Sequence, residues 1–412
     1  MLDFNCSKVK GGVFAMILAK VSFTFTGSTG GGFPGGGVVG TVVAPGTNAG
    51  GVVEVGNVEA VCASTIRFEN LIEPNSGASP CYESAREGRS VCFGKSEPVL
   101  RVKPGTVIEL YTEDCFGGAV TGPDTLPSKV CVFPFLNPVS GPIYVEGAEP
   151  GDTVAVHFIE IEPARDWAVS STFPHFGALT VTHQTAMLHD ALEERVWKYD
   201  VDKTARTVTY HATKSGYSVS MPLDPMHGTV GVAPGGFEAR ATITPDAHGG
   251  NMDTPELRAG TTVYFGVNHE GALLAIGDGH CRQGDGEVIG TAVEAAMNTV
   301  IVIDLIKGVY TPWPRIESAH EIMSSGSTRP LEDAYRISQH DLVTWVAAES
   351  KLDTLDSLQL VSQAGKAPVG NVVDPNYTFV SKIEKKYLPN KVVYGGVHDR
   401  LAKLGAQYKA EK

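Results

Sequence analysis

Most of the chain is built of short apolar runs separated by turn residues. Ile108, Leu110 and Thr112 occupy every second position of one segment, and apolar residues do the same within 154–158. This is the period of a strand with one buried face. A glycine followed by a β-branched run, a typical entry into a strand, occurs at 102–108, 148–154 and 257–263. The pattern predicts an antiparallel β protein.

One run is apolar at nearly every position, and helical spacing begins only late in the chain. Residues 300–305 are apolar nearly throughout, which predicts a strand covered on both faces. Residues 330–350 place apolar side chains mostly three and four positions apart, Pro330 suits the first turn, and a shorter helix is predicted at 354–364. We therefore expect a mainly β (α+β) fold, a β-sandwich core with flanking C-terminal helices.

The beginning of the chain differs in texture from the rest. No charged residue occurs between Val21 and Val53, where Gly, Val and Thr dominate. Glycine in this density loses much backbone entropy on ordering and offers little to bury. We therefore divide the chain into a glycine-rich low-complexity segment, 1–63, to which we assign no function, and a folded domain, 64–412.

Composition and charge narrow the class of protein. Among 412 residues, 42% are hydrophobic and 19% charged, which excludes a disordered chain, and 47 glycines with 25 prolines disfavour a helical bundle. Lys and Arg number 33 against 46 Asp and Glu, a formal net charge of −13. This acidic balance favours neither a nucleic acid nor a membrane as partner, and a small-molecule substrate stays open.

The cysteines and the N-terminal apolar stretch bear on the compartment. Seven cysteines, an odd number without CxxC spacing, fit neither a disulfide framework nor a zinc ribbon. The apolar stretch 11–19 is too short to span a bilayer and lacks a convincing cleavage site. We therefore expect a reducing compartment and a cytoplasmic protein.

The densest polar run, 277–287, follows the apolar strand 272–276. It holds Asp278, His280, Asp285 and Glu287, interleaved with glycines that let the backbone turn sharply. Crowded carboxylates raise the pKa of one of them or require a cation, and either outcome suits an active site. The alternative is a solvated turn whose aspartates cap backbone N–H groups.

Two further places offer candidate side chains. In the run 248–253, Asn251 and Asp253 alternate and so face one side of an extended chain, and His248 can join them if the glycines bend it. Oxygen donors with an imidazole suit zinc, although such a run alone is usually turn chemistry. Asp114 ends a predicted strand before a glycine pair, where a turn cap is the common alternative.

Several blocks together resemble the acetamidase/formamidase family. These blocks are 137–152, 231–234, 248–253 and 271–294, and the resemblance extends from about Val91 to Pro389. It implies a mainly β sandwich with flanking helices in 64–412, hydrolysis of small linear amides to a carboxylate and ammonia, a divalent metal ion with zinc as first candidate, and a homo-oligomer. The matching polar positions are Asp114, Glu146, Asn251, Asp253, Asp278, His280, Asp285 and Glu287.

Cysteine nucleophiles of the family do not carry over. Ile289 stands where the family commonly has Cys, and Cys281 stands where relatives commonly have Ala. The leading hypothesis is therefore amide hydrolysis by a metal-activated water. In this hypothesis Asp253, Asp278 and His280 hold the metal.

The other matching positions receive expected roles in the same hypothesis. Glu287 is the expected general base, and Asp285 and Asp114 are further catalytic candidates. Asn251, Glu146 and His248 are the expected substrate-binding residues. Three alternatives stay open: a metal-free carboxyl pair, a hydrolase of the same fold that acts on a larger amide or lactam, and a non-catalytic cation-binding β-sandwich.

Overall fold

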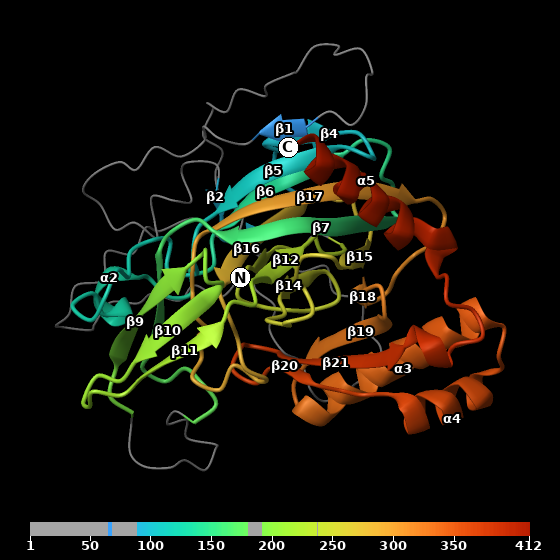
Figure 1. Ribbon diagram of the computed structural model, residues 1–412. Coiled ribbons are helices and arrows are strands. Elements are labelled where there is room, and N and C mark those ends of the chain that lie inside the picture. The colour runs from blue at the N-terminus through green and yellow to red at the C-terminus, as the bar shows by residue number, and fades with distance from the viewer. Residues whose placement is uncertain (1–64, 68–88, 180–191, 237) are drawn as a thin grey trace, which may run out of the picture. The chain divides into compact units, whose positions relative to one another are not determined.

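The computed structural model describes residues 65–67, 89–179, 192–236 and 238–412 (Figure 1). The glycine-rich segment 1–63 lies outside the described residues. The largest sheet runs in the order β1-β5-β17-β7-β15-β18-β19-β21-β20, with β1 parallel to β5 and the other pairs antiparallel. Its strands are β1 (Thr65–Arg67), β5 (Val107–Thr112), β17 (Met297–Ile306), β7 (Thr153–Pro163), β15 (Thr262–Gly266), β18 (Arg315–Glu317), β19 (Glu321–Thr328), β21 (Tyr377–Glu384) and β20 (Val369–Asn371).

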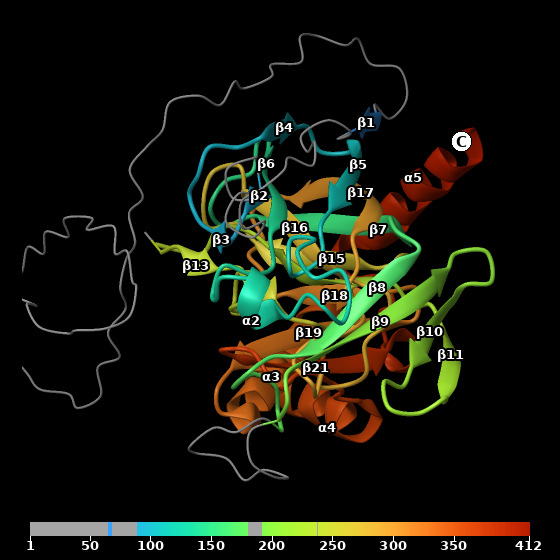
Figure 2. The ribbon, with the colours of Figure 1, turned by 90° about the vertical axis from the view of Figure 1, so that its left-hand side faces the viewer.

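A second sheet runs in the order β14-β12-β16-β6-β2, and β4 pairs with β6 in parallel. Its strands are β14 (Gly249–Asn251), β12 (Met226–Gly231), β16 (Leu274–His280), β6 (Val139–Val145), β2 (Arg89–Ser90) and β4 (Leu100–Val102). Four more strands lie side by side in an antiparallel group (Figure 2). They are β11 (Ser218–Pro222), β10 (Thr207–His211), β9 (Arg195–Asp202) and β8 (Trp167–Thr172). The short strands β13 (Arg240–Ala241) and β3 (Cys92–Phe93) form a separate pair.

The two larger sheets share one hydrophobic core, which confirms the predicted sandwich. Phe158 and Ile301 from the first sheet and Leu274 from the second are fully buried in it. The apolar run of β17 is covered on both faces as predicted, because Ile301 faces this core and Val302 faces a second core under the helices. Alternation with period two therefore placed the strands correctly.

Helices cover the outer face of the first sheet. They are α3 (Leu331–Ser350), α4 (Thr354–Ala364) and α5 (Val397–Glu411), with short turns at α2 (Pro127–Val130), η2 (Lys385–Tyr387) and η3 (Tyr394–Gly396). Trp345 of α3 and Leu401 of α5 pack against Val302 and Ile322 of the sheet. The helices at 331–350 and 354–364 match the predicted ranges, whereas α5 was not predicted. Among the described helices, none is both long and apolar enough to cross a membrane.

Candidate active site

Three neighbouring strands of the second sheet carry the polar residues of the candidate site. Thr229 of β12 pairs with Asn251 of β14 on one side and with Gly277 of β16 on the other. Asp278 and His280 follow at the end of β16, and their side chains meet. The sheet therefore joins the two polar sequence runs that were predicted separately.

Close approach of the carboxylates depends on a glycine and on unusual backbone conformations. A Cβ at Gly228 would overlap Asp253 Oδ1 and Asp278 Oδ2, so a side chain does not fit there. Asp253, Asp278 and Glu287 have φ angles of 46°, 55° and 48°, a region that residues other than glycine rarely adopt. Such strain persists only where the surrounding structure imposes it, and it concentrates at functional sites.

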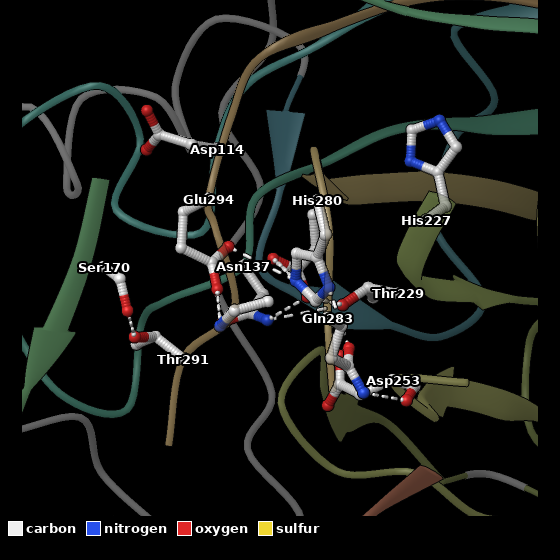
Figure 3. Close-up of polar contacts among 12 residues, drawn as sticks. Asp114, Asn137, Ser170, His227, Thr229, Asp253, His280, Gln283, Thr291 and Glu294 are labelled. Carbon is white, nitrogen blue, oxygen red and sulfur yellow. Dashed lines mark hydrogen bonds and ion pairs between the residues drawn. The ribbon is translucent and has the colours of Figure 1, made fainter. Parts of the chain in front are cut away.

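Six buried residues form one ionisable cluster around a single imidazole. Figure 3 labels three of them, Asp253, His280 and Glu294. His280 Nε2 lies 3.3 Å from Asp278 Oδ1 and 3.3 Å from Glu294 Oε2. Ligand atoms of Asp253, His280 and Glu287 all lie within 4.8 Å of one another. We call this cluster the acidic floor; its members are Asp253, Asp278, His280, Glu287, Glu294 and Asp374.

Gln283 determines which nitrogen of His280 faces the cluster. Its Nε2 donates to the carbonyl oxygens of Asp253 and Gly370 at 2.5 and 2.9 Å, so its Oε1 is left to accept. That oxygen lies 3.0 Å from His280 Nδ1, which must therefore carry the proton. His280 Nε2 then points at the carboxylates, with its lone pair available when the ring is neutral.

A network of amides and a hydroxyl holds the carboxylates in place. Asn137 Nδ2 donates to Asn251 Oδ1 at 3.0 Å and to Asp278 Oδ2 at 2.9 Å, and the Thr229 hydroxyl also donates to Asn251 Oδ1. Asn251 Nδ2 donates to Asp253 Oδ2 and to Asp374 Oδ2, both at 2.8 Å. Both amide hydrogens of Asn251 are therefore already used within the acidic floor.

Burial and mutual repulsion change the pKa values of most carboxyl groups in the floor. Burial, and next the charge of Asp278, raise the pKa of Asp253 to about 7, and burial raises the pKa of Glu294 to about 7. Burial and the charge of Asp253 raise the pKa values of Glu287 and Asp374 well above their ordinary values. These groups therefore retain protons near neutral pH unless a positive charge balances them.

Asp278 and His280 behave as the ionised pair of the floor. Burial opposes charge on both groups. The charge of His280 nevertheless lowers the pKa of Asp278, and the charges of Glu294 and Asp278 raise the pKa of His280 well above its ordinary value. The imidazole is thus the main positive charge that several acids share.

Several atoms of the floor have no hydrogen-bond partner within the described part of the chain. They are Asp253 Oδ1, Asp278 Oδ1, His280 Nε2 and Glu294 Oε2. Buried polar atoms are rarely left unpaired, because desolvation without a hydrogen bond is costly. Three carboxylate oxygens and an imidazole nitrogen are suitable ligands for a divalent cation such as zinc, so these residues fit the metal that was expected.

Of the nine predicted site residues, the structure brings five together. Asn251, Asp253, Asp278, His280 and Glu287 are buried and in mutual contact or close to it. They lie in the two runs whose glycines were predicted to bend the chain. Convergence of these side chains is the central prediction from the sequence, and the geometry agrees with it.

The remaining four predicted residues lie elsewhere. Asp285 is exposed at the tip of its loop, and Glu146 is exposed at the end of β6, so neither contacts the floor. His248 is buried against the ring of Phe93, with ring centroids 5.1 Å apart, and packs in the core. The predicted catalytic role of Asp285 and the predicted substrate-binding roles of Glu146 and His248 are therefore corrected.

Asp114 follows the alternative that was named for it. Its Oδ1 accepts from the backbone N–H groups of Phe116 and Gly118 at 3.0 and 2.9 Å, as a turn cap does. Its Oδ2 lies 3.0 Å from Arg165 Nη1, and Figure 3 shows it apart from the other carboxylates. Asp114 thus shapes the turn that presents Cys115, and its catalytic role stays a prediction.

Sequence reasoning missed several residues of the site. Ligand atoms of Cys115, Asp278 and Glu294 lie within 4.8 Å of one another, and Asp374 bonds to Asn251. Glu294 had a sequence signal, because it is a single acid within the apolar run 292–297, which predicts a buried charge. Asp374 had none, because long-range pairing alone brings it to the floor.

Four residues of the acidic floor, Asp278, Glu287, Glu294 and Asp374, line a pocket of about 420 Å³, counted with its open mouth. Polar residues of the floor and its surroundings line the inner part, and apolar side chains line the rest. The lining residues are Cys115, Phe116, Phe133, Leu136, Asn137, Phe173, Phe176, Ile243, Asn251, Asp278, Glu287, Gly290, Thr291, Glu294 and Asp374. A small molecule with a polar end therefore has access to the buried carboxylates.

The chain is similar to known proteins in sequence and in fold. Residues 93–237 and 236–339 match the sequence profile of the Acetamidase/Formamidase family. A crystal structure of acetamidase from Yersinia enterocolitica superposes with a TM-score of 0.70 at 39% identity, over 79% of this chain and 93% of that chain.

Curated relatives match over a shorter length. An acetamidase from Mycolicibacterium smegmatis is 28% identical over 50% of this chain, and a formamidase from Methylophilus methylotrophus is 25% identical over 51%. These matches span 63% and 61% of the two relatives.

Proposed function

The chain belongs to the Acetamidase/Formamidase family, and from this premise we propose that it hydrolyses the C–N bond of small linear amides to a carboxylate and ammonia. The observation that carries the proposal is the acidic floor, where buried carboxyl groups in excess surround one imidazole at the bottom of an open pocket. Protein interiors avoid such an excess unless it binds a cation or moves protons.

We also propose that the floor binds a divalent cation, with zinc as first candidate. Asp253, Asp278, His280 and Glu294 would hold it, because each of them presents a buried atom without a hydrogen-bond partner. A cation bound there supplies a Lewis acid and lowers the pKa of a coordinated water toward about 7. Gln283 supports this arrangement, since it fixes the His280 tautomer whose Nε2 faces the carboxylates.

Glu287 is suited to carry the proton through the reaction. It lines the pocket, and burial with the charge of Asp253 raises its pKa well above the ordinary value, so its protonated form can give a proton to the leaving nitrogen. A cation held in the floor would favour its ionised form, which is the form that accepts a proton from water. It takes one proton from the attacking water as the C–O bond forms. It gives that proton to the nitrogen as the C–N bond breaks, which releases ammonia and leaves the carboxylic acid.

Cys115 is not suited to act as the nucleophile, although it lies in the pocket. Burial, and then the charges of Glu294 and Asp278, raise the pKa of its thiol well above the ordinary value. The thiolate is the reactive form of cysteine, and neighbouring carboxylates disfavour it. Direct attack by water is therefore the better route.

The test is ammonia release from an amide panel, combined with elemental analysis of the purified full chain. We expect hydrolysis of at least one carboxamide, bound divalent metal, and loss of activity after exhaustive chelation. Activity that survives removal of the metal would overturn the proposal of a catalytic cation. It would instead support hydrolysis by Glu287 and a second carboxyl group without a metal. Absence of hydrolysis together with a melting temperature that depends on the cation would instead support the cation-binding β-sandwich.

We further propose that the protein is a cytoplasmic homo-oligomer with a small-molecule amide as its partner. Cys92, Cys115 and Cys281 form no disulfide, which supports a reducing compartment. Sedimentation of the purified chain tests the oligomeric state. A monomer at micromolar concentration would overturn the proposed homo-oligomer.

A further inference from the structure

Three phenylalanines lie around the mouth of the pocket. Phe133 follows α2, and Phe173 and Phe176 follow β8. The ring centroids of Phe133 and Phe173 are 6.1 Å apart with planes at 29°, and those of Phe133 and Phe176 are 6.3 Å apart. These distances lie in the range in which aromatic rings attract one another, so the rings form a continuous wall. We call Phe133, Phe173 and Phe176 the phenylalanine collar.

The collar is a built part of the pocket. Gly290 has φ of +99°, and a Cβ there would lie 2.8 Å from Phe176 Cδ1, so the glycine lets this ring lie against the backbone. Phe133 remains 50% exposed beside the pocket, although its burial would stabilise the chain. An exposed aromatic wall beside a polar floor is the usual arrangement of a small-molecule site.

The collar exceeds what formamide or acetamide can use. Acetamide has one methyl group beyond its amide and formamide has none, so a molecule with its amide on the acidic floor leaves the rings exposed to water. The charge of the pocket also limits which charged groups the rest of the substrate can carry. None of the lining residues is Lys or Arg, and the floor is acidic, which disfavours an amide that carries a carboxylate elsewhere in the molecule.

We propose that the phenylalanine collar is the acyl-group subsite, and that the preferred substrate is a neutral primary carboxamide whose acyl group is flat and apolar, such as an arylacetamide. This inference rests on the proposed function, because it assumes that the amide group reacts at the acidic floor. Burial of the aryl ring against the collar then favours the larger amide, since each buried methylene changes kcat/KM by about tenfold or more. The collar residues act on specificity and take no part in proton transfer.

The experiment compares kcat/KM for formamide, acetamide, benzamide and phenylacetamide in the full chain as purified. We expect the wild-type protein to prefer phenylacetamide over acetamide by at least about tenfold. In Phe173→Ala and Phe133→Ala this ratio falls about tenfold, mostly through KM for phenylacetamide. Phe133→Leu, which keeps apolar volume, retains more of the ratio than Phe133→Ala.

Phe135→Ala is the matched control, because Phe135 is a 44% exposed phenylalanine of the same loop that does not line the pocket. It should leave the ratio unchanged. A wild-type preference for acetamide or formamide overturns the inference and leaves the proposed function intact, and so does an equal loss for both substrates in the collar variants. If the wild-type protein hydrolyses none of the four amides, the proposed function fails and the inference falls with it.

Discussion

The acidic floor differs from a second buried ionic cluster, which lies between the first sheet and the C-terminal helices. In this second cluster Arg315 meets Asp341 through two hydrogen bonds of 2.8 Å, and Lys385 Nζ lies 2.5 Å from Glu317 Oε1. We call these four residues the paired cluster. Each cation in it faces one carboxylate, and none of the four has a buried side-chain atom without a partner.

The contrast separates structural burial of charge from functional burial. In the paired cluster, attraction and hydrogen bonds offset the desolvation of both ions, so removing one partner exposes the full desolvation cost of the other. In the acidic floor, several acids share one imidazole, and repulsion among them opposes folding. Such a conflict is kept where it serves function, at a cost in stability.

The first prediction tests whether the acidic floor serves function at a cost in stability. Glu287→Gln removes the proton carrier and one of several repelling acids. We expect kcat/KM for a hydrolysed amide to fall by about 10²- to 10⁴-fold, while the melting temperature stays equal or rises. Ammonia release and calorimetry of the same sample measure both quantities. A variant that loses stability and keeps activity would assign Glu287 to the fold and not to the reaction.

The second prediction tests whether the paired cluster serves the stability of the fold. Arg315→Met leaves Asp341 buried without its cation, and we expect the free energy of unfolding to fall by about 3–5 kcal/mol. The double variant with Asp341→Asn should recover part of this loss, because it removes the uncompensated charge. Urea unfolding gives the free energies, and kcat of the folded fraction should stay unchanged. Equal losses in the single and double variants would argue against the charge as the cause.

The sequence predicted those features that depend on local pattern. Alternation along β7 and helical spacing in α3 each depend on the geometry of one element alone. The structure has a strand and a helix at these predicted positions. Asp278 and His280 were predicted because they lie close together in one short run. Asp374 was missed because it reaches the floor through long-range contacts, among them the hydrogen bond from Asn251.

The error at Asp285 has a local cause. Asp285 and Glu287 are two positions apart, and on an extended chain both would face the same side. The intervening Gly286 has φ of +82° and Glu287 has φ of 48°, so the chain turns between them and carries Glu287 inward alone. Crowding of acids within one short run therefore did not bring both of them to the floor.

The third prediction sharpens the contrast by loosening the floor without changing its charge. Gln283→Leu keeps a similar volume but removes the acceptor for His280 Nδ1, so the ring loses its fixed orientation and tautomer. We expect a 10- to 100-fold weaker affinity for the proposed divalent cation and a comparable fall in kcat/KM. Titration with a competing chelator measures the affinity independently of activity. Unchanged affinity would mean that His280 is oriented by its neighbours in the floor alone.

The fourth prediction concerns a third kind of buried group, a neutral imidazole. Thr262 Oγ1 lies 2.9 Å from Nδ1 of both His157 and His398, which joins α5 to the sheet. Burial, and then the charge of His398, lower the pKa of His157 to about 3, and burial, and then the charge of Lys385, lower that of His398 to about 4. The folded protein therefore keeps both rings neutral below about pH 6.5, where the unfolded chain binds protons.

The sign of the effect follows from this difference in bound protons. The stability that neutral His398 supports is fully present above about pH 6.5, and it is lost as pH falls toward the folded pKa of about 4. His398→Gln should make the dependence of the unfolding free energy on pH shallower by at most about 1.4 kcal/mol per pH unit between pH 6 and 5, with little change at pH 7.5. The exposed His320→Gln is the matched control and should leave the slope unchanged. If the curve for His398→Gln runs parallel to that of the wild-type protein, His398 binds its proton in the folded state as readily as in the unfolded chain, and the neutral ring is not a source of the pH dependence.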